Sequence, residues 1–204
     1  MDKQKKVTIK SLWDWSTDIV ILNILWVIFS IPLITIGAST SALWNIMLDK
    51  INGDDVNLFV DFFISFKKNL KRSTVAFLLI IMVGILFIIN FMISHIYVEL
   101  NVLELVFLTL ILLLIGFSQY LFPIIAFTDL TLDKLFKKSF FFTFAFFPKT
   151  ILSISISIIP LLVIIFIPFN MMGIILSLLF FVAFSVWANA HLLLKIFSNQ
   201  LNCF

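Results

Sequence analysis

The chain has 204 residues, of which 62% are hydrophobic and 12% are charged, and its mean hydropathy is +1.19. An ordinary globular protein is roughly 45–50% apolar and about 25% charged, so a soluble core cannot bury the apolar surface of this chain. The composition excludes a soluble enzyme, a secreted disulfide scaffold, a nucleic-acid-binding module and a disordered protein. We expect one integral membrane domain over residues 1–204, with the lipid bilayer as its solvent.

The first apolar region, residues 19–48, is divided by Pro32, and proline removes a backbone donor and breaks a helix. We predict a broken helical hairpin over residues 11–48 that turns near Ser30–Pro32. One alternative is a single long span, which reduces the number of membrane helices from six to five. Another is a shallow re-entrant pair. We do not expect a cleaved signal peptide, because the segment before the apolar core is long and acidic as well as basic.

The second arm of this hairpin contains only small residues between Gly37 and Ala42. Gly37 and Ser41 are four residues apart, as are Ala38 and Ala42, and small residues at this spacing let two helix backbones approach closely. Together with Pro32, these residues form a predicted interface, either for packing between helices of this chain or for a partner.

Residues 58–70 read LFVDFFISFKKNL, with phenylalanines at helical spacing and lysines on other faces. This pattern is typical of an amphipathic helix that lies in the membrane interface. Membrane anchoring alone explains it. The functional alternative is a cytoplasmic docking helix, whose contacts we assign to Phe63, Phe66, Lys67 and Asn69.

Four later segments are long and apolar enough to span a bilayer as helices, which takes about 20 residues each. They are residues 74–96, 103–127, 151–169 and 173–194. Lys and Arg occur before, between and after pairs of spans but not in the short links within each pair. The positive-inside rule therefore predicts a multi-pass plasma-membrane protein with six membrane helices and both termini in the cytoplasm. The expected fold is an all-α polytopic helical bundle.

Few residues carry reactive chemistry. The predicted topology separates His95 from His191, and the single cysteine, Cys203, has no histidine near it in the sequence. A metal site or a cysteine nucleophile is therefore not expected. Proton-coupled transport usually requires an ionisable residue at membrane depth. No Asp, Glu, Lys or Arg lies in the middle of a predicted span. We expect no catalytic, cofactor-binding or metal-binding residues.

Three sets of residues resemble the motifs of a known family. The first set is Asn23, Leu25, Trp26, Ser30, Pro32, Thr35, Gly37, Ala38, Ser39, Thr40 and Ala42. The second set is Phe63, Ser65, Phe66, Lys67, Asn69 and Leu70. The third set is Phe122, Pro123, Asp129 and Leu132. These motifs resemble the YesL family, which comprises bacterial integral membrane proteins of unknown function.

The resemblance implies a function by association. YesL-like proteins are commonly encoded beside binding-protein-dependent carbohydrate uptake systems, which implies a non-enzymatic accessory subunit that binds the permease subunits of an ABC importer. The alternative is an independent permease or channel that acts as a homo-oligomer, for which Asn90, Gln119 and Asn189 supply polar groups. No nucleic-acid partner is expected.

Overall fold

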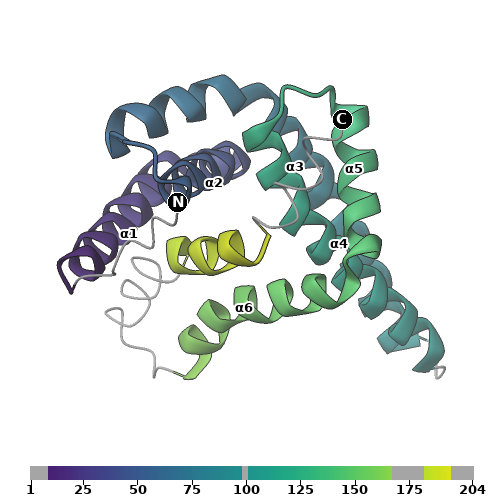
Figure 1. Ribbon diagram of the computed structural model, residues 1–204. Coiled ribbons are helices and arrows are strands. Elements are labelled where there is room, and N and C mark those ends of the chain that lie inside the picture. The colour runs from purple at the N-terminus through teal and green to yellow at the C-terminus, as the bar shows by residue number, and fades with distance from the viewer. Residues whose placement is uncertain (1–8, 98–100, 167–181, 194–204) are drawn as a thin grey trace.

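The computed structural model describes residues 9–97, 101–166 and 182–193, and these residues are helical apart from short links. The helices are α1 (Ile9–Phe29), α2 (Ile36–Asn52), α3 (Leu58–Tyr97), α4 (Asn101–Phe127), α5 (Leu132–Ala145) and α6 (Phe147–Phe166). A short 3-10 helix, Leu33–Thr35, precedes α2, and a further helix covers Val182–Leu193. The predicted all-α fold is confirmed for the described residues (Figure 1).

In the described part of the chain, two helices are long and apolar enough to cross a membrane, Leu58–Ile96 and Val102–Phe127. In the most apolar stretch of each helix, few residues are buried inside the protein, 6% in the first helix and 17% in the second. Because such large outward-facing apolar surfaces are stable only in contact with lipid, the chain is a membrane protein. Residues 132–158 supply a third candidate if their bent helix pair counts as one span.

The predicted break near Ser30–Pro32 is present between α1 and α2. Thr35 stabilises it, because its hydroxyl lies 2.7 Å from the carbonyl oxygen of Phe29 and 2.7 Å from that of Pro32. Pro32 itself is exposed at the turn. Since α1 and α2 lie on either side of this turn, a helix pair replaces one long helix here.

Contacts at both ends of the pair show that α1 and α2 run antiparallel. Near the turn, Trp26 Nε1 donates to Thr40 Oγ1 at 3.1 Å. At the other end, Lys50 forms an ion pair with Asp18, and its Nζ lies 5.2 Å from the centre of the Trp15 ring. The two arms therefore form a helical hairpin.

The prediction of a separate interfacial helix over 58–70 followed by a span over 74–96 is wrong in one respect, because α3 is one continuous helix of 40 residues. Its start is fixed by Asn57, whose backbone N–H donates to Asp61 Oδ2 at 2.8 Å. The intervening residues 71–73 include neither proline nor glycine, so nothing interrupts the backbone hydrogen bonds.

α5 and the first part of α6 meet at an angle of 99°, so that α6 lies across the bottom of Figure 1. Pro148 in the first turn of α6 has no N–H to donate back to α5, which ends one helix and starts the next. The predicted span 151–169 therefore begins earlier, at Phe147, and its last three residues lie outside the described residues. Of the predicted span 173–194, only Val182–Leu193 is described.

α2 is the most enclosed helix among those described. Its fully buried apolar side chains are those of Ala38, Ala42, Leu43, Ile46, Met47 and Leu48. The Val182–Leu193 helix lies between the hairpin and α6 (Figure 1). Trp187 on this helix lies 6.5 Å from Trp15 of α1, measured between ring centres, and Asn189 bonds to Ser157 of α6. The last described helix therefore contacts both α1 and α6.

Candidate functional site

The small residues of α2 pack directly against α3. Ala38, Ser41 and Ala42 are buried, and a Cβ atom added to Gly37 would lie only 2.5 Å from the carbonyl oxygen of Ser73. The hydroxyls of Ser41 and Ser73 are 2.7 Å apart. We call this contact the α2–α3 seam. Gly37 and Ser41 contact α3 of the same chain, and Ala38 and Ala42 are buried, so in the described part of the chain these residues form an internal helix-packing surface.

The predicted docking residues lie on two sides of α3. Phe63 and Lys67 are exposed, whereas Asn69 is buried. Phe66 is half-buried, and its ring centre lies 4.9 Å from that of Phe29 in α1. The ring centre of the exposed Phe63 also lies 6.0 Å from that of Phe29, so both phenylalanines contact α1. Five exposed side chains of this segment form what we call the outer face of α3, those of Phe59, Val60, Phe63, Ile64 and Lys67.

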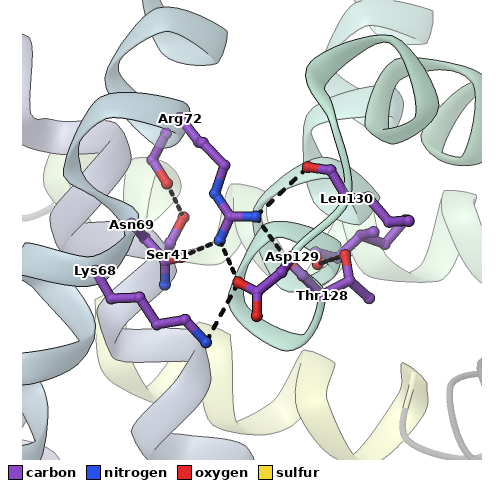
Figure 2. Close-up of polar contacts among 9 residues, drawn as sticks. Ser41, Lys68, Asn69, Arg72, Thr128, Asp129 and Leu130 are labelled. Atoms are coloured by element: carbon purple, nitrogen blue, oxygen red, sulfur yellow. Dashed lines mark hydrogen bonds and ion pairs between the residues drawn. The ribbon is translucent and has the colours of Figure 1, made fainter.

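A cluster of polar contacts around Arg72 joins α3 to the link between α4 and α5 (Figure 2). One guanidinium nitrogen, Nη1, donates to the carbonyl oxygens of Thr128 at 2.9 Å and Leu130 at 3.4 Å. The other, Nη2, donates to Asn69 Oδ1 at 2.8 Å and Asp129 Oδ1 at 3.1 Å. Only the rigid, forked guanidinium of arginine suits so many acceptors at once. These residues and Lys68 form the Arg72 cluster.

Lys68 adds a second cation to this cluster, with its Nζ 3.3 Å from Asp129 Oδ1. The pKa of Asp129 lies below its ordinary value, chiefly because Lys68 hydrogen-bonds to the carboxylate and attracts its charge, and secondarily because of Arg72. The Asp129 carboxylate therefore pairs with Arg72 and Lys68, while the Arg72 guanidinium also bonds to two backbone carbonyls. The arrangement holds the α4–α5 link in place.

The sequence predicts Asn69 as a docking residue and does not indicate the central role of Arg72. The available signal was composition, because Arg72 is the only arginine among 14 basic residues. In a chain that otherwise uses lysine, a lone arginine indicates a position that needs the planar fork. Its partners were not predictable, since Thr128 and Leu130 accept through backbone atoms.

A second polar network joins α4, α6 and the Val182–Leu193 helix. Ser157 Oγ of α6 accepts hydrogen bonds from Gln119 Nε2 of α4 at 2.9 Å and from Asn189 Nδ2 at 3.1 Å. Asn90 does not belong to it, because its side chain is exposed on α3 and donates to the carbonyl oxygen of Leu86. The structure therefore brings together two of the three polar residues that suggested a permease.

Buried polar atoms without a hydrogen-bond partner accompany this network in the described part of the chain. They include Asn189 Oδ1 and Ser153 Oγ, which lies one helical turn before Ser157. Asn23 is also buried, and its Oδ1 accepts from the backbone N–H of Ala183 at 2.9 Å while its Nδ2 has no partner. Such groups are expensive to bury, so this region retains unused hydrogen-bonding capacity.

The remaining candidates for chemistry are dispersed. His95 Nδ1 lies 3.0 Å from Glu104 Oε1 where α3 and α4 meet, and the ring of His191 contacts that of Trp187. Among the described residues, no group of three or more His, Cys, Asp or Glu side chains is placed to bind a metal ion. Cys203 lies outside the described residues.

The helices and their outward apolar surfaces define an all-helical integral membrane protein. Within the chain, residues 19–91 match the model of a family described as "Protein of unknown function, DUF624". The matched stretch contains the α2–α3 seam, the outer face of α3 and Arg72, but not Asp129. No significant match was found among curated proteins or solved structures.

Proposed function

We propose that this chain is a YesL-type plasma-membrane protein that acts as a non-enzymatic accessory subunit of a bacterial carbohydrate ABC importer. The match to a family of unknown function is compatible with the YesL resemblance. We further propose six membrane helices, two of them formed by the hairpin, with both termini in the cytoplasm, because this topology places every basic stretch on one side.

The observation that carries the accessory role is the outer face of α3. Its four apolar side chains, which are 51–62% exposed, are those of Phe59, Val60, Phe63 and Ile64. Phe62 on the opposite side is completely buried. An exposed apolar patch beside charged residues is typical of an interaction site, and the outer face has Lys67 at its edge.

The position of the outer face indicates the kind of partner. α3 continues without a break from this face into its membrane-length stretch. A protein that contacts the outer face is therefore held at the depth where α3 enters the bilayer. A membrane-embedded permease subunit meets this requirement, whereas a soluble partner has to reach the surface of the lipid.

Co-purification tests the proposal. The chain is tagged at its C-terminus, extracted from native membranes in mild detergent, and its partners are identified by mass spectrometry. We expect ABC permease subunits in a fixed ratio, and we expect Phe63→Glu to reduce their recovery. Phe141→Glu is the matched control, because Phe141 is similarly exposed but lies on α5. A self-associated species without importer subunits contradicts the accessory role.

A topology experiment tests the number of spans separately. A short reporter epitope or a single labelling cysteine is introduced at Pro32, the exposed turn of the hairpin. Labelling from the outside of intact cells supports six membrane helices. Absence of outside labelling, with a positive signal after permeabilisation, contradicts the crossing hairpin.

The second candidate function is an independent permease, and the polar network is the observation that favours it. Gln119, Ser157 and Asn189 join three helices, and the neighbouring unpartnered atoms leave capacity for hydrogen bonds to a polar solute. Liposomes that contain only this chain provide the test, with a labelled disaccharide as the probe. Uptake that Asn189→Leu abolishes supports the permease, and no uptake excludes it for that sugar.

A further inference from the structure

An apolar groove lies between α3, α4 and α5, with a cavity volume of about 560 Å³. Side chains from all three helices form its walls, including those of Leu79, Val83, Leu113, Phe117, Phe140 and Lys137. α3 and α4 are the two membrane-length helices described above. The groove is therefore formed by helices whose outer surfaces contact lipid.

The walls of the groove select for an apolar ligand. Of the lining residues, only Lys137 and Thr143 have polar side chains. The Thr143 hydroxyl is already used, because it donates to the carbonyl oxygen of Ser139 at 2.8 Å. A sugar or a peptide bound here would lose its hydrogen bonds to water without replacement, which is unfavourable. A hydrocarbon chain has no such requirement.

Lys137 provides charge at the edge of the groove. Its side chain lines the cavity but is 76% exposed, and its Nζ lies 2.9 Å from Asp133 Oδ2, one helical turn back toward the start of α5. Such an exposed i,i+4 ion pair contributes little to stability, so an anion can compete for the amine. α5 carries Lys134 and Lys138 as well, which leaves the helix with an excess of positive charge.

The charged edge and the apolar walls match the two parts of a phospholipid. Basic pockets between membrane helices bind anionic lipid headgroups, and an aliphatic lysine stem lies along apolar surface while its amine reaches the interface. We propose that this groove binds an acyl chain of an anionic phospholipid and that Lys137 binds the phosphate of its headgroup. The proposal does not depend on the accessory role.

Native mass spectrometry of retained lipid tests the proposal. The purified full chain is incubated in detergent with equal amounts of phosphatidylglycerol and phosphatidylcholine. We expect preferential retention of phosphatidylglycerol, and Lys137→Ala should reduce this preference about fivefold. Lys134→Ala is the matched control on the same helix, because Lys134 is exposed but does not line the groove, and it should leave the preference nearly unchanged.

A second pair of variants tests the cavity itself. Val83→Trp fills the groove from the α3 wall and should reduce retention of both lipids, whereas Val75→Trp, on the same helix outside the groove, should not. Equal retention in Val83→Trp and the natural chain overturns the proposal, as does an unchanged lipid preference in Lys137→Ala. Photocrosslinking from position 83 to another polypeptide, in place of lipid, also overturns it.

Discussion

α3 makes two contacts of opposite character along neighbouring stretches. At the α2–α3 seam, a Cβ on Gly37 would lie 2.5 Å from Ser73 O and 2.6 Å from Phe77 Cβ, so the backbones touch. Beside the groove, a Cβ on Gly84 would meet only Leu114 Cδ2, at 3.4 Å. The close contact requires glycine at position 37, whereas position 84 has room for a larger residue. The size of the facing side chains decides whether two helices close on each other or leave room for a ligand.

The largest expected effect comes from testing this difference with one substitution at two sites. Gly37→Ala forces the new Cβ against the α3 backbone and should lower the free energy of unfolding by about 1–3 kcal/mol. Gly84→Ala has room and should raise it by up to about 1 kcal/mol, because alanine favours helix more than glycine does. SDS titration in mixed micelles measures both. The same sign for both variants contradicts the comparison.

The Arg72 cluster holds the α4–α5 link, and therefore one wall of the groove, against α3. Arg72→Lys keeps the charge but cannot reach the carbonyls of Thr128 and Leu130 together with Asp129. We expect a loss of about 1–2 kcal/mol in the free energy of unfolding. The exposed neighbour Lys71 is the control, and Lys71→Ala should change stability by less than about 0.5 kcal/mol. Similar losses in both variants exclude a special role for the fork.

A smaller effect is expected from the bond between the arms of the hairpin, from Trp26 Nε1 to Thr40 Oγ1 at 3.1 Å. A double-mutant cycle with Trp26→Phe and Thr40→Val separates this bond from the packing of the two side chains. We expect a coupling energy of about 0.5–1.5 kcal/mol. Strictly additive losses would mean that the bond does not contribute to closing the α1–α2 side of the bundle.

The smallest expected effect depends on pH. The pKa of Asp129 is lowered from 3.8 in the folded state, so its contribution to stability is present above pH 3.8 and is lost as the pH falls through the folded pKa. Thermal unfolding from about pH 6 to about pH 3 should therefore show less acid sensitivity in Asp129→Asn than in the natural chain. High salt should reduce the difference, because the group is fully exposed.

The pKa of Asp49 is shifted in the opposite direction to that of Asp129, so the expected change in stability on substitution has the opposite sign. Its pKa is raised from 3.8 by burial and then by the nearby charges of Asp54 and Asp61. The folded state therefore disfavours the ionised carboxylate, and Asp49→Asn should raise stability at neutral pH. A destabilised Asp49→Asn would contradict this assignment.

Much of the fold could be predicted because it follows from single residues and from long apolar runs. Pro32 removes a backbone donor, and the break lies where that loss requires it. The stretch 103–127 matches α4 to within two residues. The separation of 58–70 from 74–96 failed because a change in polarity does not by itself break a helix. The start of α6 at Phe147 lies before the apolar run at residue 151, because proline favours the first turn of a helix and Pro148 lies there.

The candidate site was less accessible to sequence analysis, because it depends on which helix covers which face. The pattern of Gly37 and Ser41 predicts close packing but not that Ser73 of the same chain is the neighbour. Likewise, the spacing of Phe63 and Phe66 predicts one amphipathic surface. In the structure both rings lie near that of Phe29 in α1, at 6.0 Å and 4.9 Å, and Phe63 is exposed as well. The groove depends on three helices at once, and no local pattern encodes it.

The corner between α5 and α6 has a consequence for biogenesis. The Thr150 hydroxyl lies 3.0 Å from the carbonyl oxygen of Thr143 and 3.1 Å from that of Phe146, and it is within 3.1 Å of the Tyr120 hydroxyl of α4. Carbonyls freed at a bend are costly in lipid unless a neighbour satisfies them. The corner can therefore enter the bilayer at low cost only after α4 is in place. Because the chain is synthesised from N- to C-terminus, α4 and its Tyr120 leave the ribosome before the α5–α6 corner does.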